Sequence, residues 1–241
     1  MSHPFRLYGH RGAAAHHPEN TLRSFRAAVE AGVDAIETDV RLSRDGEVVV
    51  FHDADGARTC GVPHRVRETP WAEVATWDAG EGEHPIRLVE LLEAFPGVFV
   101  NVDLKDDDPE AAVRTLAVLA RAGHAERIGL GSFHRRVVGE LRRRGYHGQL
   151  ALAPHEVAAA RLLPAPLAAR VVRGNAAQIP VSGGRIRLDA PGFIARCHRL
   201  GLRVDYWTID DPAQARALVA AGADGIVTND PAAVRAALEG P

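Results

Sequence analysis

Three short stretches of the sequence carry side chains suited to acid–base and phosphate chemistry. Gly-His-Arg-Gly contains His10 and Arg11, Glu-Thr-Asp begins at Glu37, and Phe-His-Asp contains His52. The two histidines can exchange protons near neutral pH, and the guanidinium of Arg11 is a fork of donors that matches a pair of phosphate oxygens. The three stretches predict a site for phosphoryl transfer, provided that the fold brings them together.

Carboxylates are placed at regular positions on two expected strands. Alternation puts Glu37 and Asp39 on one face of the first of these strands, and Asp103 and Lys105 on one face of the second. Bare carboxylates are costly to bury, so we expect the three acids to share a hard cation. Ligand sets made of oxygen alone favour Mg²⁺ or Ca²⁺ over Zn²⁺, while Lys105 adds a positive charge beside them.

Short apolar runs alternate with longer runs of helical periodicity along the chain. Strands are predicted over residues 5–9, 35–40, 98–104, 128–132, 149–153, 176–180, 204–208 and 225–227. Helices are predicted over residues 21–31, 109–121, 135–144, 191–200 and 212–221. This alternation predicts a parallel sheet, and eight such strands in 241 residues are typical of a (β/α)8 TIM barrel, whose active site lies at the C-terminal ends of the strands. An open doubly wound sheet is disfavoured because no Gly-x-Gly-x-x-Gly loop follows a strand.

A tight turn at Asp45-Gly46 interrupts the barrel pattern after the second strand. It separates two apolar-rich runs and predicts a hairpin that extends from this strand. With a two-residue turn, Asp39 faces His52, so that the histidine returns to the barrel mouth. Residues 54–85 have no clear periodicity, and we interpret them as a small insertion at the mouth of a single domain that spans residues 1–241.

The overall composition argues against several classes of function. The net charge of −2 gives no general attraction to nucleic acid. Cys60 and Cys197 lack metal-type spacing, and no apolar leader or membrane-length apolar run is present. We therefore expect no nucleic-acid partner, no stable membrane insertion and a cytoplasmic location.

The sequence resembles the glycerophosphodiester phosphodiesterase family. The longest matching stretch is GHRGAAAHHPENTLRSFRAAVEAGVDAIETDVRLSRDGEVVVFHD at residues 9–53. It is followed, in the family's order and spacing, by NVDLK, AAQIP, YWTID and GADGIVTNDP. The likeness runs nearly from end to end.

The resemblance implies a (β/α)8 barrel that cleaves small glycerophosphodiesters to sn-glycerol 3-phosphate and an alcohol, with a divalent metal. It also implies a reaction through a cyclic phosphate that water then opens. The implied roles are acid–base catalysis for His10 and His52, phosphate binding for Arg11 and Lys105, metal binding for Glu37, Asp39 and Asp103, and apolar contacts for Phe133 and Trp207.

Some positions leave alternatives open. The family usually has Glu where this chain has Asp103, which is one methylene shorter and puts the metal preference in question. Glu19 is either a first-turn helix residue favoured by the helix dipole or a residue of the site. For Asn20, the two alternatives are helix capping and a role in the site.

Two other functions remain in view. A lysophospholipase D would use the same site and need an apolar surface at the barrel mouth, for which the insertion is fairly polar. A catalytically silent barrel that binds a phosphodiester is the alternative of another class. No motif specifies the alcohol, the metal or the oligomeric state.

Overall fold

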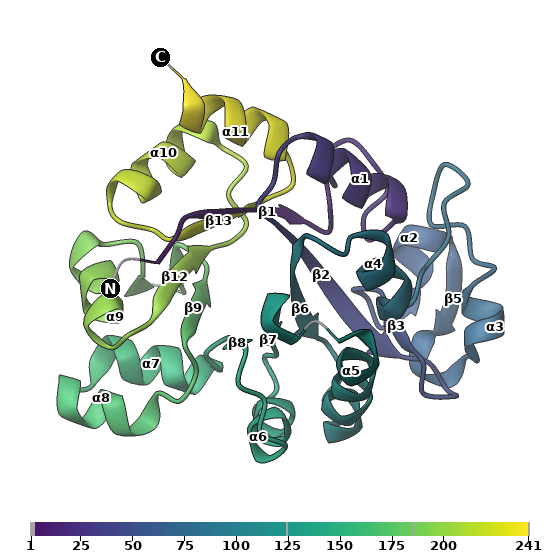
Figure 1. The fold of residues 1–241 in the computed structure, drawn as a ribbon, viewed down its shortest axis with the longest axis horizontal. Helices are drawn as coiled ribbons and strands as arrows, with labels where there is room; N and C mark the ends of the chain where they lie inside the picture. The colour runs from purple at the N-terminus through teal and green to yellow at the C-terminus, as the bar shows by residue number, and fades with distance from the viewer. Residues whose placement is uncertain (1–2, 124, 185, 241) are drawn as a thin grey trace.

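The computed structural model describes residues 3–123, 125–184 and 186–240. Eight strands of its main sheet run parallel around a barrel (Figure 1). Their order is β8-β7-β6-β2-β1-β13-β12-β9. A parallel bridge between Ala151 and Ala176 joins the two ends of this order and nearly closes the barrel. The strands are β1 (Arg6–His10), β2 (Ala35–Leu42), β6 (Phe99–Leu104), β7 (Ile128–Gly131), β8 (Gln149–Leu150), β9 (Ala176–Ile179), β12 (Arg203–Tyr206) and β13 (Gly225–Thr228). The predicted (β/α)8 barrel is confirmed.

Helices follow the barrel strands and surround them (Figure 1). They are α1 (Leu22–Glu30), α4 (Leu88–Ala94), α5 (Pro109–Ala122), α6 (Arg135–Arg143), α7 (Pro154–Leu162), α8 (Ala165–Val171), α9 (Pro191–Arg199), α10 (Pro212–Ala220) and α11 (Pro231–Glu239). Asp-Pro begins three of them: Asp108, Asp211 and Asp230 accept a hydrogen bond from the first turn, and the following proline lacks the N–H that would be unpaired there.

The hairpin forms, but its expected register is wrong by one residue. β2 pairs with β3 (Val48–Val50) through Val40 and Val50, and Phe51 N donates to Asp39 O at 2.9 Å, so Asp39 faces Phe51 rather than His52. The turn contains three residues instead of two, because Ser43 N donates to Glu47 O and Gly46 adopts a φ of 83°. His52 lies beyond the end of β3 and still reaches the mouth.

Residues 54–85 form a small layer against this hairpin. They contain β4 (Asp55–Gly56), α2 (Ala57–Cys60), β5 (Val62–Arg65), the 3₁₀ helix η1 (Val66–Glu68) and α3 (Trp71–Val74). Phe51 and Trp77 pack edge to face, with ring centroids 5.9 Å apart, in a separate cluster with Val49 and Val74. The apolar residues of the segment therefore pack with those of the hairpin in a cluster apart from the main core.

The main core lies between the strands and the helices, whereas the lower barrel interior is polar. Arg203 forms a buried ion pair with Asp205, which also accepts from Tyr8 Oη at 3.3 Å, and Gln178 donates to Asn101 at 2.9 Å.

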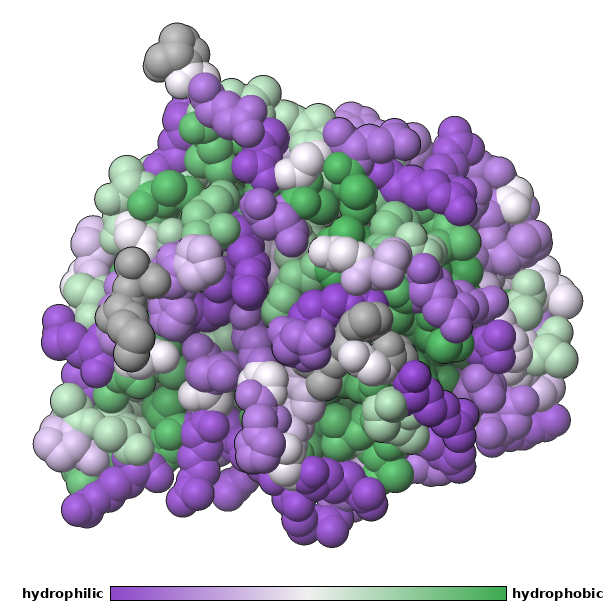
Figure 2. Space-filling model, viewed as in Figure 1, coloured by the Kyte–Doolittle hydropathy of each residue, from purple (hydrophilic) through white to green (hydrophobic). Residues whose placement is uncertain are grey.

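Hydrophilic residues occupy much of the outer edge of the face in Figure 2. Within the described residues, no helix has the length and apolar character needed to cross a membrane.

Candidate active site

A cavity of about 590 Å³ lies at the C-terminal ends of the barrel strands. Of the residues singled out in the sequence, nine line it: His10, Arg11, Glu37, Asp39, His52, Asp103, Lys105, Phe133 and Trp207. They come from strands that are far apart in the chain but adjacent in the barrel. Glu19 does not line this cavity and lies behind it, against Arg11.

The turn after β1 positions Arg11. Its backbone has a φ of 53°, in the left-handed region that non-glycine residues rarely adopt, and the next residue, Gly12, has a φ of 92°. A Cβ on Gly12 would lie 2.3 Å from Ser24 Oγ, so the turn packs directly against α1 and requires glycine. The structure thereby fixes the arginine at the rim of the cavity.

Asp39 is the centre of the charge network. It is 1% exposed, and its two oxygens lie 2.9 Å from Arg11 Nε and 2.9 Å from Lys105 Nζ. The Arg11 Nε contact has ion-pair distance but not hydrogen-bond alignment. Burial opposes ionisation of Asp39, but Lys105 and Arg11 outweigh it and lower its pKa. Lys105, the only lysine of the sequence, also donates to Asp103 Oδ2 at 2.6 Å.

Glu37 and Asp103 have the opposite electrostatic character. Burial raises the pKa of Glu37 well above its ordinary value, and the nearby charge of Asp39 adds to this effect. Burial also raises the pKa of Asp103 in spite of Lys105. The wall therefore holds more potential negative charge than Arg11 and Lys105 offset.

The chemistry of this wall fits a hard divalent cation, because all three acids present oxygen and the three carboxylates outnumber the two cations beside them. In the part of the chain that the structure describes, however, no group of three or more His, Cys, Asp or Glu residues is arranged to hold a metal ion. Lys105 engages two of the three carboxylates instead, Asp39 and Asp103.

The surroundings of His10 define its tautomer. Asn229 Nδ2 donates to Asp210 Oδ2 at 2.8 Å, so Asn229 Oδ1 faces His10 Nδ1 at 2.7 Å. The amide oxygen therefore accepts a hydrogen bond from His10 Nδ1–H. Nε2 is then the basic nitrogen, and it lies 3.8 Å from Glu37 Oε2. Burial, followed by the charge of Arg11, lowers the pKa of His10 and favours the neutral ring.

The Nδ1 partner of His52 is a carboxylate, whereas that of His10 is an amide. His52 Nδ1 lies 2.6 Å from Asp53 Oδ1, so that nitrogen donates and Nε2 is left for the cavity. Burial opposes ionisation of Asp53, but hydrogen bonds from Arg58 and His52 lower its pKa to about 2. Arg58 Nε donates to Asp53 Oδ2 at 2.6 Å. The second histidine therefore has a permanently negative neighbour.

Glu19 links Arg58, the partner of Asp53, to Arg11. Its carboxylate accepts from Arg11 Nη1 at 2.9 Å and from both terminal nitrogens of Arg58, at 2.8 and 2.7 Å. Helix α1 begins only at Leu22, with Thr21 as N-cap, so Glu19 and Asn20 are not first-turn residues. Asn20 instead accepts from Thr38 Oγ1 at 2.8 Å and donates to Asp39 at 3.3 Å.

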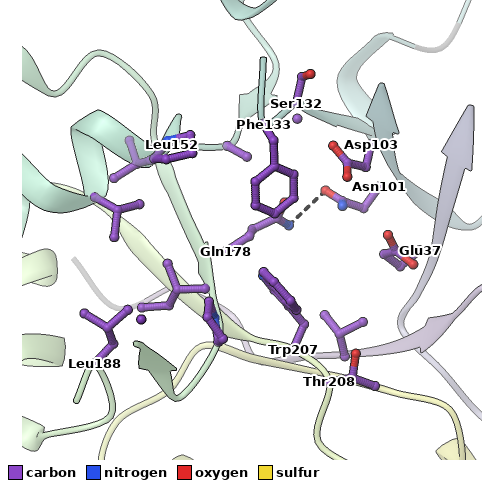
Figure 3. A pocket seen from close by; sticks show the side chains of 18 of the residues that line it. Glu37, Asn101, Asp103, Ser132, Phe133, Leu152, Gln178, Leu188, Trp207 and Thr208 are labelled. Carbon is purple, nitrogen blue, oxygen red and sulfur yellow. Dashed lines mark hydrogen bonds between the residues drawn. The ribbon is translucent and has the colours of Figure 1, made fainter. Parts of the chain in front are cut away.

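Aromatic side chains separate two halves of the cavity. Phe133 and Trp207 meet edge to face, with centroids 6.0 Å apart, and Lys105 Nζ lies 5.9 Å from the Phe133 ring centroid. Figure 3 shows Glu37 and Asp103 on one side of these rings and apolar side chains on the other.

Sequence reasoning missed the partners that orient the two histidines. Asp53 directly follows His52, and Asn229 and Asp210 lie within stretches already noted for the resemblance, so each had a signal. Arg58 had none, because it lies in the aperiodic segment and acts through contacts that only the fold creates.

Comparisons with known proteins agree with this geometry. The model of the glycerophosphoryl diester phosphodiesterase family matches residues 10–233. The probable glycerophosphodiester phosphodiesterase 2 of Mycobacterium tuberculosis is 31% identical over 93% of this chain and 89% of its own length. The glycerophosphodiester phosphodiesterase of Caldanaerobacter subterraneus is 27% identical over 93% and 94%. The crystal structure of the Agrobacterium tumefaciens enzyme superposes with a TM-score of 0.84 at 27% identity, over 98% of this chain and all of that one.

Proposed function

The chain belongs to the glycerophosphoryl diester phosphodiesterase family, and we propose that it hydrolyses glycerophosphodiesters to sn-glycerol 3-phosphate and an alcohol. The observation that carries the proposal is that two histidines on one cavity have different hydrogen-bond partners at Nδ1. His10 Nδ1 binds a neutral amide, whereas His52 Nδ1 binds a carboxylate.

This difference assigns the roles in the first step. His10, neutral and basic at Nε2, accepts the proton of the substrate's glycerol hydroxyl as that oxygen attacks phosphorus. His52 donates a proton to the leaving alcohol oxygen as its bond to phosphorus breaks, and Asp53, which lies 2.6 Å from Nδ1, holds the ring with Nε2 toward the cavity. The products of this step are a cyclic phosphate and the free alcohol.

The second step reverses the roles. His52, now neutral, accepts a proton from water as the water oxygen attacks phosphorus. His10 returns a proton to the glycerol oxygen as the ring opens, which gives the phosphomonoester and restores both histidines.

Positive charge on the cavity wall stabilises the phosphoryl oxygens in both steps. Arg11 and Lys105 line the cavity beside the histidines and are suited to bind these oxygens. Glu37, Asp39 and Asp103 would hold a divalent cation, Mg²⁺ or Ca²⁺. The cation would supply Lewis-acid stabilisation of the phosphoryl charge.

The test is a coupled assay of glycerol 3-phosphate release from glycerophosphocholine. We expect release with Mg²⁺ or Ca²⁺, none with EDTA, and a loss of about 10²–10⁴-fold in kcat for His10→Ala and for His52→Ala. Binding of the substrate without turnover under any metal would instead support a silent barrel.

A further inference from the structure

Arg41 lies at the end of β2, one position on the same face beyond the acidic residues of the cavity wall. Alternation places its side chain with those of Glu37 and Asp39. The Arg41 side chain is only 17% exposed, yet it does not line the cavity. Because it does not reach the substrate, its role must be sought in the groups to which it donates.

The end of β2 lies between the two segments that carry His52 and Lys105. On one side, Asp39 O accepts from Phe51 N at 2.9 Å, and His52 follows Phe51 beyond the end of β3. On the other side, Val40 O accepts from Lys105 N at 3.1 Å, just beyond the end of β6 (Figure 1). Both segments therefore leave the sheet beside the last residues of β2.

The guanidinium of Arg41 joins these two segments. Its Nε donates to His52 O at 2.8 Å, and its Nη1 donates to Asp106 Oδ1 at 2.8 Å. Asp106 directly follows Lys105, and its other oxygen accepts from Leu42 N at 2.8 Å. Arg41 and Asp106 thus connect the backbone at His52, the backbone of β2 and the residue next to the lysine.

The bond to His52 O supplies something that Asp53 does not. Asp53 is the next residue of the same segment, so its hydrogen bond to Nδ1 sets the rotation of the ring but not the distance of this segment from β2. Arg41 connects the segment to β2, the strand that carries Asp39. The position of His52 relative to the cavity wall is therefore tied to this guanidinium.

We propose that Arg41, held by Asp106, is a positioning residue that places His52 for proton donation to the leaving alcohol. The inference rests on the proposed function and deepens it, because Arg41 acts through His52 and not on the substrate. A displacement of about 1 Å in such a group can cost about 10²-fold in rate. Arginine suits this role, since its planar fork sends Nε and Nη1 in two fixed directions, whereas a lysine ammonium is a single point.

The test compares two substrates that differ in their need for a proton donor. The choline oxygen of glycerophosphocholine is a poor leaving group unless a proton is supplied, whereas 4-nitrophenol leaves glycerophospho-4-nitrophenol readily as its anion. With Mg²⁺ or Ca²⁺ present, release of choline or nitrophenol gives kcat/KM for the step in which the leaving group departs. Loss of a well-placed proton donor should therefore affect the first substrate far more than the second.

The Arg41 variants should show this selectivity. We expect Arg41→Gln to lower kcat/KM about 10–100-fold on glycerophosphocholine and at most about threefold on the nitrophenyl substrate. Arg41→Lys keeps the charge but cannot make both bonds, so it should show the same selective loss. Asp106→Asn keeps the shape of the side chain without its charge and should show a smaller loss of the same kind. Circular dichroism checks that each variant is folded.

Arg67 provides a matched control, because it also joins a carbonyl group of the hairpin to carboxylates. Its Nη1 donates to Ser43 O at 3.2 Å, and its Nη2 donates to Asp108 and Glu110 at 3.0 and 2.9 Å. Arg67 does not line the cavity and has no hydrogen bond to His52. Arg67→Gln should leave kcat/KM on both substrates unchanged.

Each outcome decides the inference. Equal losses on the two substrates in the Arg41 variants, or no loss on either, would overturn it and leave the proposed function intact, as would the same selective loss in Arg67→Gln. His52→Ala is the reference and should also lose activity mainly on glycerophosphocholine. Equal losses there would contradict the role assigned to His52 and this inference with it. A parent enzyme that cleaves neither substrate would contradict the proposed function itself.

Discussion

Asn229 Oδ1 lies 2.7 Å from His10 Nδ1, and Asp210 holds the same amide from its other side. The two residues come from opposite ends of the chain, and the parallel pairing of β1 with β13 brings them together. The amide fixes which nitrogen of His10 faces the cavity without adding a charge that would keep the ring protonated.

Changing this amide to a carboxylate should change the pH dependence of the reaction. Burial lowers the pKa of His10, so the free enzyme holds this base neutral down to a pH below the ordinary range. In Asn229→Asp, a negative neighbour favours the charged ring, and the acidic limb of the kcat/KM profile should move to higher pH by about one unit. Asn229→Ala should lower kcat without that movement. An identical acidic limb in the parent and Asn229→Asp would contradict His10 as the base.

Removal of the Asp53 charge should lower kcat, because Asp53 supports His52, the proposed proton donor. Asp53→Asn removes the negative neighbour of His52, and we expect kcat to fall about 10–100-fold with little change in KM. The matched control is Asp78→Asn, in the adjoining 54–85 segment, whose carboxylate accepts from Gly80 N in a local turn. Equal activity of the two variants would show that Asp53 does not support catalysis.

The sequence was sufficient to predict the barrel, because each strand and helix has its own period and the joints between them are short. It also predicted which acids face inward, since alternation on β2 and β6 is a local property. The hairpin register was wrong because one additional residue in the turn, with Gly46 left-handed, shifts every facing pair. Arg58 and the apolar half of the cavity could not be predicted, because their importance depends on contacts between segments that no periodicity encodes.

Glu37 should destabilise the metal-free protein near neutral pH. Its pKa is raised in the folded state, so its favourable contribution is present below about pH 4.5 and is lost as the pH rises through the folded value. At pH 7, Glu37→Gln should therefore be more stable than the parent without metal, by roughly 1 kcal/mol or more.

Metal should reverse that order. Mg²⁺ or Ca²⁺ should raise the Tm of the parent, because binding to the folded state stabilises it, and should have much less effect on Glu37→Gln. Glu93→Gln, an exposed substitution on α4, is the control and should behave as the parent. A metal-induced rise in Tm of the same size in Glu37→Gln would remove this residue from the metal site.

Lys105 should not be replaceable by arginine. The ammonium lies between Asp39 and Asp103 as a compact charge, at 2.9 and 2.6 Å, whereas a guanidinium is planar and larger. We expect Lys105→Arg to lose at least about tenfold in kcat/KM, and Lys105→Met about 10²-fold, consistent with loss of a charge on the phosphoryl group. Kinetics at fixed metal concentration check this, and full activity of Lys105→Arg would show that net charge alone is required.

The most direct measurement is release of glycerol 3-phosphate from glycerophosphocholine by the purified protein, followed in EDTA and then with Mg²⁺ or Ca²⁺ added. The account predicts release only with metal, and its loss in both His10→Ala and His52→Ala while circular dichroism shows the fold retained. Metal-independent release, or parental rates in either histidine variant, would contradict it.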